Sequence, residues 1–161
     1  MIRAERRRGS REVSLGGHPA LLTVPSGARF RELPAFAGGK SYGGRMTSRA
    51  HAAAPLDGVR GLAFLGFPLH PAGRPSVDRG DHLADAAGPL LFLQGDRDAL
   101  AGLALLRPVV RKLGRRARLH VVPGADHGFA VPRSSGREPA DVHAELARVV
   151  GSWMEETVGR G

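Results

Sequence analysis

Short apolar runs alternate with longer segments of helical length from Leu33 to the end of the chain. Four runs, which we expect to be strands, cover residues 33–38, 59–66, 89–94 and 118–122. The segments between and after them predict helices near 43–54, 78–87, 99–113 and 139–158. In the last of these helices the apolar residues recur three and four positions apart, which places them on one helical face.

The two central runs are apolar at consecutive positions instead of alternating ones. Residues 62–65 read Leu-Ala-Phe-Leu, and residues 90–93 read Leu-Leu-Phe-Leu. A strand with this pattern is buried on both faces, as in a parallel sheet that helices cover on each side. We therefore predict an α/β fold with a mostly parallel sheet flanked by helices.

The first 30 residues differ in composition from the rest. They hold six Arg and two Glu, so that +4 of the formal net charge of +9 lies in this segment. The short apolar run at 20–24 is compatible with a hairpin or with a disordered tail. We expect residues 1–30 to be a weakly structured basic leader and residues 31–158 to form the main domain.

Composition excludes several classes of protein. A chain of 161 residues with 42% apolar residues and no cysteine can form one domain, without disulfides or cysteine-ligated zinc. The sequence has no uninterrupted apolar stretch of the length that a secretory signal or a membrane span needs. We expect a cytoplasmic protein with no membrane partner. Because the body is only mildly basic and aromatic residues are few, we also favour no nucleic-acid partner.

A candidate nucleophile follows the first predicted strand. The segment Gly39-x-Ser41-x-Gly43 lies where that strand meets the next helix. A nucleophile on such a sharp turn adopts a strained backbone, and glycines two residues on either side let strand and helix approach while the hydroxyl projects above the sheet. The alternative for Ser41 is a helix N-cap.

The same residues end in Gly-Lys-Ser, as a phosphate-binding P-loop does. That motif needs a glycine five residues before Gly39, where this chain has Pro34. The run from Pro34 to Ala37 is also strand-like, which leaves too little glycine for an anion-binding loop. The sequence therefore favours a nucleophile over a P-loop.

Two further candidates follow later strands. Asp98 comes after the run 89–94, in a glycine turn that also carries Asp96, and we prefer Asp98 as the residue that orients a histidine. The alternative for Asp98 is a helix N-cap. His127 follows the strand at 118–122 in a loop, which suits a base that reaches a neighbouring strand end, and the alternative is a surface histidine.

Ser41, Asp98 and His127 thus each follow a strand of one predicted parallel sheet, in the order of a serine-hydrolase triad. His127 would take the hydroxyl proton as Ser41 attacks a carbonyl, and Asp98 would fix the imidazole tautomer. The backbone N–H of Tyr42 is the natural oxyanion donor.

Two other segments could contribute to a site. In the loop after the second strand, Phe67 and His70 are candidates for the wall of a pocket beside Ser41. The acids and histidine of residues 78–85 share a predicted helix, and we interpret them as a solvated face and not as a metal site. We expect no metal and no cofactor.

The motifs together resemble the α/β-hydrolase family that groups bacterial dienelactone-hydrolase-like proteins with a testis-expressed protein and a subunit of the nonspecific-lethal chromatin complex. They are Gly-Gly-Lys-Ser-Tyr-Gly-Gly-Arg, Gly-Leu-Ala-Phe-Leu-Gly-Phe-Pro-Leu-His-Pro, Leu-Phe-Leu-Gln-Gly-Asp-Arg-Asp and Gly-Ala-Asp-His-Gly-Phe. The likeness extends from about Leu33 to Trp153. It implies Ser41 as nucleophile, Asp98 as acid and His127 as base.

A complete member of that family has four strands, two helices and an oxyanion loop before the nucleophile, and 40 residues cannot hold them. We therefore expect the carboxyl-terminal half of an α/β-hydrolase fold, lacking the amino-terminal strands. The strand at 33–38 would be a bare edge open to self-association.

Two functions remain open at this point. One is a serine hydrolase, active or inactivated by truncation, that acts on a small-molecule ester, lactone or thioester. The other is a non-catalytic hydrolase-like module that binds protein or nucleic acid.

Overall fold

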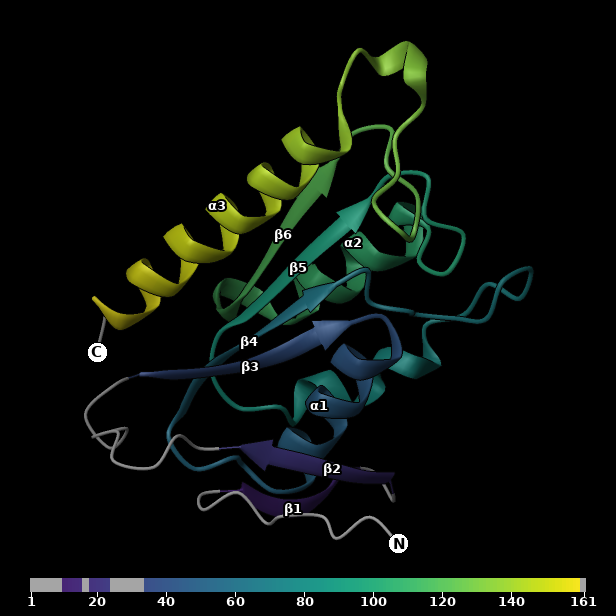
Figure 1. The fold of residues 1–161 in the computed structure, drawn as a ribbon. Helices are drawn as coiled ribbons and strands as arrows, with labels where there is room; N and C mark the ends of the chain where they lie inside the picture. The colour runs from purple at the N-terminus through teal and green to yellow at the C-terminus, as the bar shows by residue number, and fades with distance from the viewer. Residues whose placement is uncertain (1–9, 16–17, 24–33, 160–161) are drawn as a thin grey trace, which may run out of the picture.

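The structure is a computed structural model, which describes residues 10–15, 18–23 and 34–159. Four of its strands form one sheet in the order β3-β4-β5-β6, and every neighbouring pair is parallel (Figure 1). Their bounds are Ala35–Lys40 for β3, Val59–Leu65 for β4, Leu90–Gly95 for β5 and Ala117–Val122 for β6. The predicted parallel sheet is confirmed, with each strand within two residues of its expected position.

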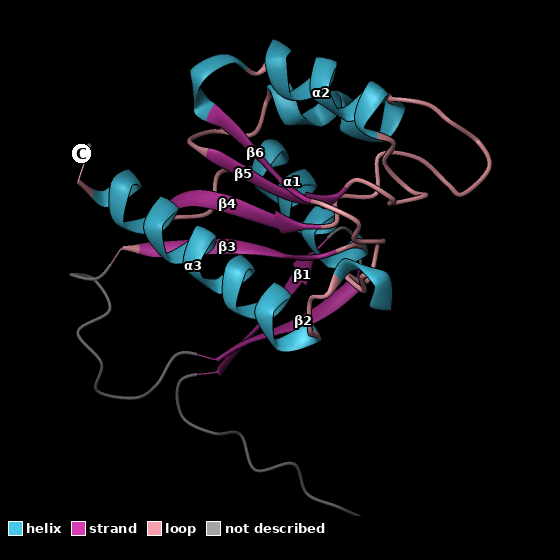
Figure 2. Cartoon of the chain, turned by 90° about the horizontal axis from the view of Figure 1, so that it is seen from above, coloured by secondary structure: helices cyan, strands magenta, loops and turns pink. Residues whose placement is uncertain are grey.

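Helices cover both faces of this sheet (Figure 2). Their bounds are Tyr42–Ala53 for α1, Leu103–Lys112 for α2 and Pro139–Val158 for α3. Three short 3-10 helices lie between them: η1 at Asp78–Ala84, η2 at Gly114–Arg116 and η3 at Arg133–Ser135. Among the described residues, no helix is long and apolar enough to cross a membrane.

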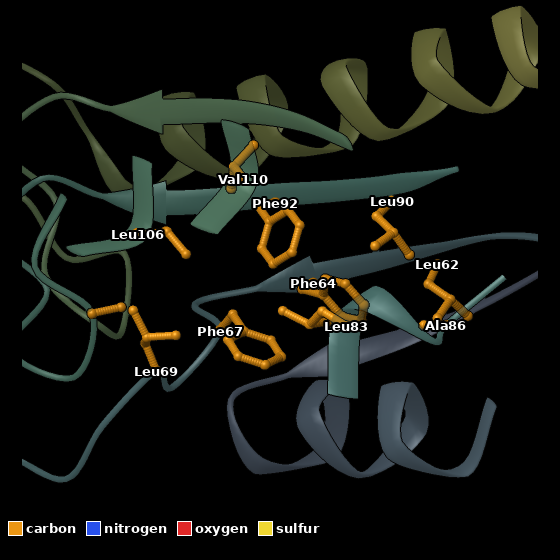
Figure 3. Packing of buried hydrophobic residues seen from close by; sticks show 11 residues of the cluster. Leu62, Phe64, Phe67, Leu69, Leu83, Ala86, Leu90, Phe92, Leu106 and Val110 are labelled. Carbon is orange, nitrogen blue, oxygen red and sulfur yellow. The ribbon is translucent and has the colours of Figure 1, made fainter. Parts of the chain in front are cut away.

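Two apolar clusters, one on each face, account for the consecutive apolar positions of β4 and β5. Phe64 and Phe92 point into a cluster closed by α2 and η1 (Figure 3). Their neighbours Ala63, Leu91 and Leu93 point the other way, into a cluster closed by α3. Because side chains alternate between the faces of a strand, only a doubly covered sheet requires apolar residues at every position.

Two predicted helices differ from the structure. The helix expected near 99–113 begins only at Leu103. Residues 78–87 were expected to form an α-helix, but η1 is a 3-10 helix that ends at Ala84. Gly80 lies within it, where a Cβ would come 3.0 Å from the Leu69 side chain. Glycine is a poor α-helix former, and η1 is short, as 3-10 segments usually are.

The described part of the predicted leader forms a separate antiparallel pair, β1 at Ser10–Leu15 with β2 at His18–Thr23. Of the two alternatives for this segment, the structure therefore has paired strands. Residues 1–9, 16–17 and 24–33 lie outside the described part of the chain. The division into a leader and a main domain stays a prediction.

β3 is an edge strand of the four-stranded sheet, with β4 as its neighbour. Phe36 anchors it by packing against Trp153 of α3, with ring centroids 5.4 Å apart. Three of the six β3 residues are exposed. Self-association through this edge stays a prediction.

Candidate functional site

Three polar side chains converge at the carboxyl ends of the strands. Ser41 follows β3, Asp98 lies three residues beyond β5, and His127 lies in the loop after β6. The His127 Nε2 atom is 2.8 Å from Ser41 Oγ, and His127 Nδ1 is 2.7 Å from Asp98 Oδ2. The structure therefore brings together the three residues that the sequence singled out.

Ser41 occupies a strained turn between β3 and α1. Its backbone angles are φ 51° and ψ −125°, and a positive φ is unusual for a residue other than glycine. The turn is held by the Ser41 N–H, which donates to the Leu65 carbonyl at 2.9 Å. Ser41 occupies the N-cap position of α1, as the alternative expected, but its side chain makes no capping hydrogen bond.

Of the two glycines that the spacing indicated, Gly39 makes the predicted close approach, since a Cβ there would lie 3.0 Å from the Gly44 nitrogen, but Gly43 does not. A Cβ on Gly44 would lie 2.5 Å from the Gly39 carbonyl oxygen, so the close contact between α1 and β3 needs Gly44. Nothing lies within 4 Å of a Cβ on Gly43. The P-loop alternative is also excluded, because Ala35–Lys40 is a strand and not a loop.

The loop that carries His127 is organised by Asp126. The Asp126 Oδ1 atom accepts hydrogen bonds from the Gly128 N–H at 2.7 Å and from the Ala130 N–H at 2.9 Å. Phe129 takes a φ of 67° within this turn, and its side chain is buried in the α3 cluster. The turn thus anchors the His127 backbone on both sides.

Gly66, directly after β4, lies against the His127 ring. Its φ is +65°, and a Cβ there would come 3.2 Å from the His127 carbonyl oxygen and 3.3 Å from Nδ1. Glycine at this position leaves room for the imidazole between the ends of β4 and β5.

The Asp98 side chain is fully buried, whereas 26% of the His127 side chain is exposed. Asp98 Oδ1 accepts the Leu100 N–H at 2.7 Å. α2 begins only at Leu103, so Asp98 does not cap it and the N-cap alternative is wrong. Asp96 is exposed, and its carboxylate accepts the Gly124 N–H at 2.8 Å instead of contacting the histidine.

Gln94, the residue before Gly95 in β5, is part of the site but was not predicted. It is fully buried, its Nε2 donates to Asp98 Oδ2, and its Oε1 accepts the Phe67 N–H at 3.0 Å. The sequence held one signal for it, since it is a polar residue that extends an otherwise apolar, doubly buried strand.

The predicted pocket residues lie in the protein interior. Phe67 is fully buried among the rings of Phe64 and Phe92, so its side chain belongs to the core and does not line open space beside Ser41. His70 is 4% exposed, and its Nδ1 lies 2.9 Å from the Pro71 carbonyl oxygen. Neither side chain contacts the three converging residues through a hydrogen bond in the described structure.

The acidic segment 78–85 also differs in part from the prediction. Its His82 ring is half-buried, and His82 Nε2 lies 2.7 Å from Ser48 Oγ on α1. Burial and the nearby charges of Arg45 and Arg49 lower the pKa of His82, although Asp81 and Asp85 oppose this. No group of three or more potential ligands that could hold a metal ion occurs in the described ranges.

A second polar cluster fixes α3 against β6. Glu145 of α3 lies 2.6 Å from His120 Nε2 and also accepts from Arg137. Burial opposes ionisation of Glu145, but the hydrogen bonds and charges of His120 and Arg137 outweigh it, and the pKa of Glu145 is lowered. This cluster supports β6, the strand that leads to the His127 loop.

Several solved structures share the fold of this chain. The esterase domain of a Rhodothermus marinus protein matches with a TM-score of 0.57 and 17% identity, over 78% of this chain and 62% of that one. A predicted CIB-like hydrolase from Thermoplasma acidophilum matches with a TM-score of 0.54 and 18% identity, over 76% of this chain and 51% of that one. A monoacylglycerol lipase from Paleococcus ferrophilus matches with a TM-score of 0.56 and 15% identity, over 76% and 68%.

The chain thus spans about half to two thirds of the length of these neighbours, and identities this low establish the fold alone. A family model described as an alpha/beta hydrolase domain matches residues 5–155, and so includes most of the segment that we expected to be a leader. The match covers most of the chain and, together with the parallel sheet and its flanking helices, identifies this protein as a member of the alpha/beta hydrolase family.

Proposed function

We propose that this protein is a serine hydrolase that cleaves a carboxylic ester, lactone or thioester of a small molecule. The observation that carries the proposal is the position of the His127 ring, which lies between Ser41 Oγ at 2.8 Å and Asp98 Oδ2 at 2.7 Å. Imidazole placed between a hydroxyl and a buried carboxylate is the arrangement that activates a serine nucleophile.

In this proposal Asp98 selects the working tautomer of His127. The buried carboxylate accepts the Nδ1–H, which leaves Nε2 without a proton and able to accept the Ser41 O–H. As Ser41 Oγ forms a bond to the substrate carbonyl carbon, its proton passes to Nε2. His127 then donates that proton to the leaving alcohol or thiol, and water releases the acyl group by the same steps.

The developing oxyanion needs donors on the far side of the carbonyl. Tyr42 is the first residue of α1 and directly follows Ser41, so its backbone N–H lies at the positive end of the helix dipole. We assign it as one oxyanion donor, and such donors typically contribute about 100-fold to the rate. Two of the similar structures are an esterase domain and a monoacylglycerol lipase, which agrees with acyl transfer.

The test is covalent labelling by a fluorophosphonate probe. We expect the wild-type protein to be labelled, Ser41→Ala to abolish labelling, and His127→Ala to reduce it at least about 1000-fold. The matched control is Ser152→Ala, because Ser152 is an exposed serine of α3 and should be dispensable. Absence of labelling in folded wild-type protein, or labelling that survives Ser41→Ala, would refute the proposal. The dienelactone-hydrolase-like assignment stays a prediction.

A further inference from the structure

We propose that Gln94 is a positioning residue that holds the Asp98 carboxylate oriented toward His127, an inference that rests on the proposed hydrolase function. Gln94 lies at the carboxyl end of β5 and is fully buried. It contacts the acid of the triad and the loop after β4. It does not touch Ser41 or the position of a substrate carbonyl through any described hydrogen bond, so its effect would pass through Asp98.

The orientation of the Gln94 amide follows from its partners. The Phe67 backbone N–H is only a donor, so the Gln94 atom 3.0 Å away must be the carbonyl Oε1. The amide nitrogen Nε2 therefore faces Asp98 Oδ2, to which it donates. Since a carboxylate can only accept, this orientation satisfies both contacts, and a flipped amide would satisfy neither.

The second step concerns the charge on Asp98. Its side chain is fully buried, and no Lys or Arg forms an ion pair with it in the described structure. The carboxylate instead accepts three hydrogen bonds, from the Leu100 N–H, from Gln94 and from His127. A buried anion without a cation depends on such donors, and loss of one leaves it partly unsatisfied.

The third step concerns geometry. Gln94 and His127 both donate to Oδ2, while the Leu100 N–H holds Oδ1. The Gln94 amide and the Leu100 N–H thus hold the two carboxylate oxygens separately. Through Phe67 the same amide ties the chain that follows Gly66, the glycine against the His127 ring. One buried side chain therefore joins the segments that follow β4 and β5 beside the triad.

Two variants separate positioning from simple core packing. Gln94→Met keeps a long unbranched side chain but makes neither hydrogen bond. Gln94→Glu keeps the shape of the side chain. Its carboxyl can accept from the Phe67 N–H in either protonation state, but it can donate to Asp98 only while it is protonated. The control is Leu91→Ala, a buried apolar change in the same strand that contacts the cluster closed by α3 and not Asp98.

For Gln94→Met we expect kcat/KM on a nitrophenyl ester to fall about tenfold at every pH. For Gln94→Glu we expect the ratio of variant to wild-type kcat/KM to be near one in acid and to fall as pH rises, because two facing carboxylates cannot both be ionised cheaply. A purely structural role predicts lower stability with pH profiles parallel to the wild type, as for Leu91→Ala. A Gln94→Glu profile parallel to that of the wild type would overturn the inference.

A second readout does not depend on turnover. The Nδ1–H proton of His127, held by Asp98, gives a far-downfield proton NMR resonance when that hydrogen bond is ordered. We expect this resonance in the wild type and in Leu91→Ala, and its loss in Gln94→Met. Its persistence in Gln94→Met would overturn the inference. The wild-type protein could show this resonance and lose it in Gln94→Met, yet neither hydrolyse esters nor react with fluorophosphonate. That result would refute the proposed function and still support the positioning role of Gln94.

Discussion

The adjacent glycines Gly43 and Gly44 differ in what a methyl group would meet. On Gly43 a Cβ has no neighbour within 4 Å, whereas on Gly44 it would lie 2.5 Å from the Gly39 carbonyl oxygen and 3.3 Å from the Phe64 ring. Both residues lie in the first turn of α1, directly after Tyr42. Alanine at the two positions therefore separates helix propensity from close packing within the same turn.

The expected free energies of unfolding follow from these contacts. Replacing glycine by alanine in a helix stabilises it by up to about 1 kcal/mol. At Gly43 this gain is unopposed. At Gly44 the overlap with a backbone carbonyl, which cannot rotate away, costs about 3 kcal/mol and leaves a net loss of about 2 kcal/mol. The two variants should thus differ by about 3 kcal/mol.

Urea unfolding measures this difference directly, and the rate of fluorophosphonate labelling measures its effect on Ser41. Gly43→Ala should unfold at higher urea than the wild type and be labelled at the same rate. Gly44→Ala should unfold at lower urea and be labelled more slowly, because α1 must move away from β3 and carry Ser41 with it. Equal destabilisation by both substitutions would refute the assignment of the close contact to Gly44.

Three further substitutions test the surroundings of the site. Gly66→Ala should slow fluorophosphonate labelling at least about tenfold, since its Cβ would press on the His127 ring from a left-handed backbone, and an unchanged rate would contradict this. Glu145→Gln should lower the free energy of unfolding in urea by about 1 kcal/mol at neutral pH. Because the pKa of Glu145 is lowered in the fold, the contribution of its carboxylate is lost as pH falls through that pKa, and the free energies of unfolding of the two proteins should become equal in acid. Burial lowers the pKa of His82, so wild-type stability should fall as pH drops below the ordinary value of 6.5, and His82→Gln should flatten that part of the stability profile measured by thermal unfolding.

Much of the fold was predictable from the sequence, because a strand that is buried on both faces has apolar residues at consecutive positions. The consecutive apolar residues of β4 and β5 required helices on each side, and the structure has them. α3 was predicted from Pro139 to Val158, its observed bounds, because one apolar face at helical spacing packs on the sheet. The rule that parallel strands carry functional groups at their carboxyl ends then placed Ser41, Asp98 and His127 together.

The missed features depend on contacts between residues far apart in the chain. Gly44 could not be distinguished from Gly43, because only the position of the Gly39 carbonyl makes one of them necessary. Phe67 follows a strand in a loop with Gly and Pro, which is typical of an exposed turn, yet its ring completes the core cluster beside Phe92. The role of Gln94 required knowing that a loop N–H and a carboxylate lie on either side of its amide.

Backbone groups near the strand ends hold the segments that carry the candidate triad. Leu65 accepts from the Ser41 turn, Leu100 donates to Asp98, and Gly128 and Ala130 donate to Asp126 beside His127. Backbone groups are fixed by the sheet and its turns, so these anchors lose little conformational entropy when a substrate binds. The side-chain contact of Gln94 with Asp98 is different, because it can be removed without altering the backbone. For this reason substitution of Gln94 offers the most direct way to disturb the geometry of the triad while the sheet that carries it stays folded.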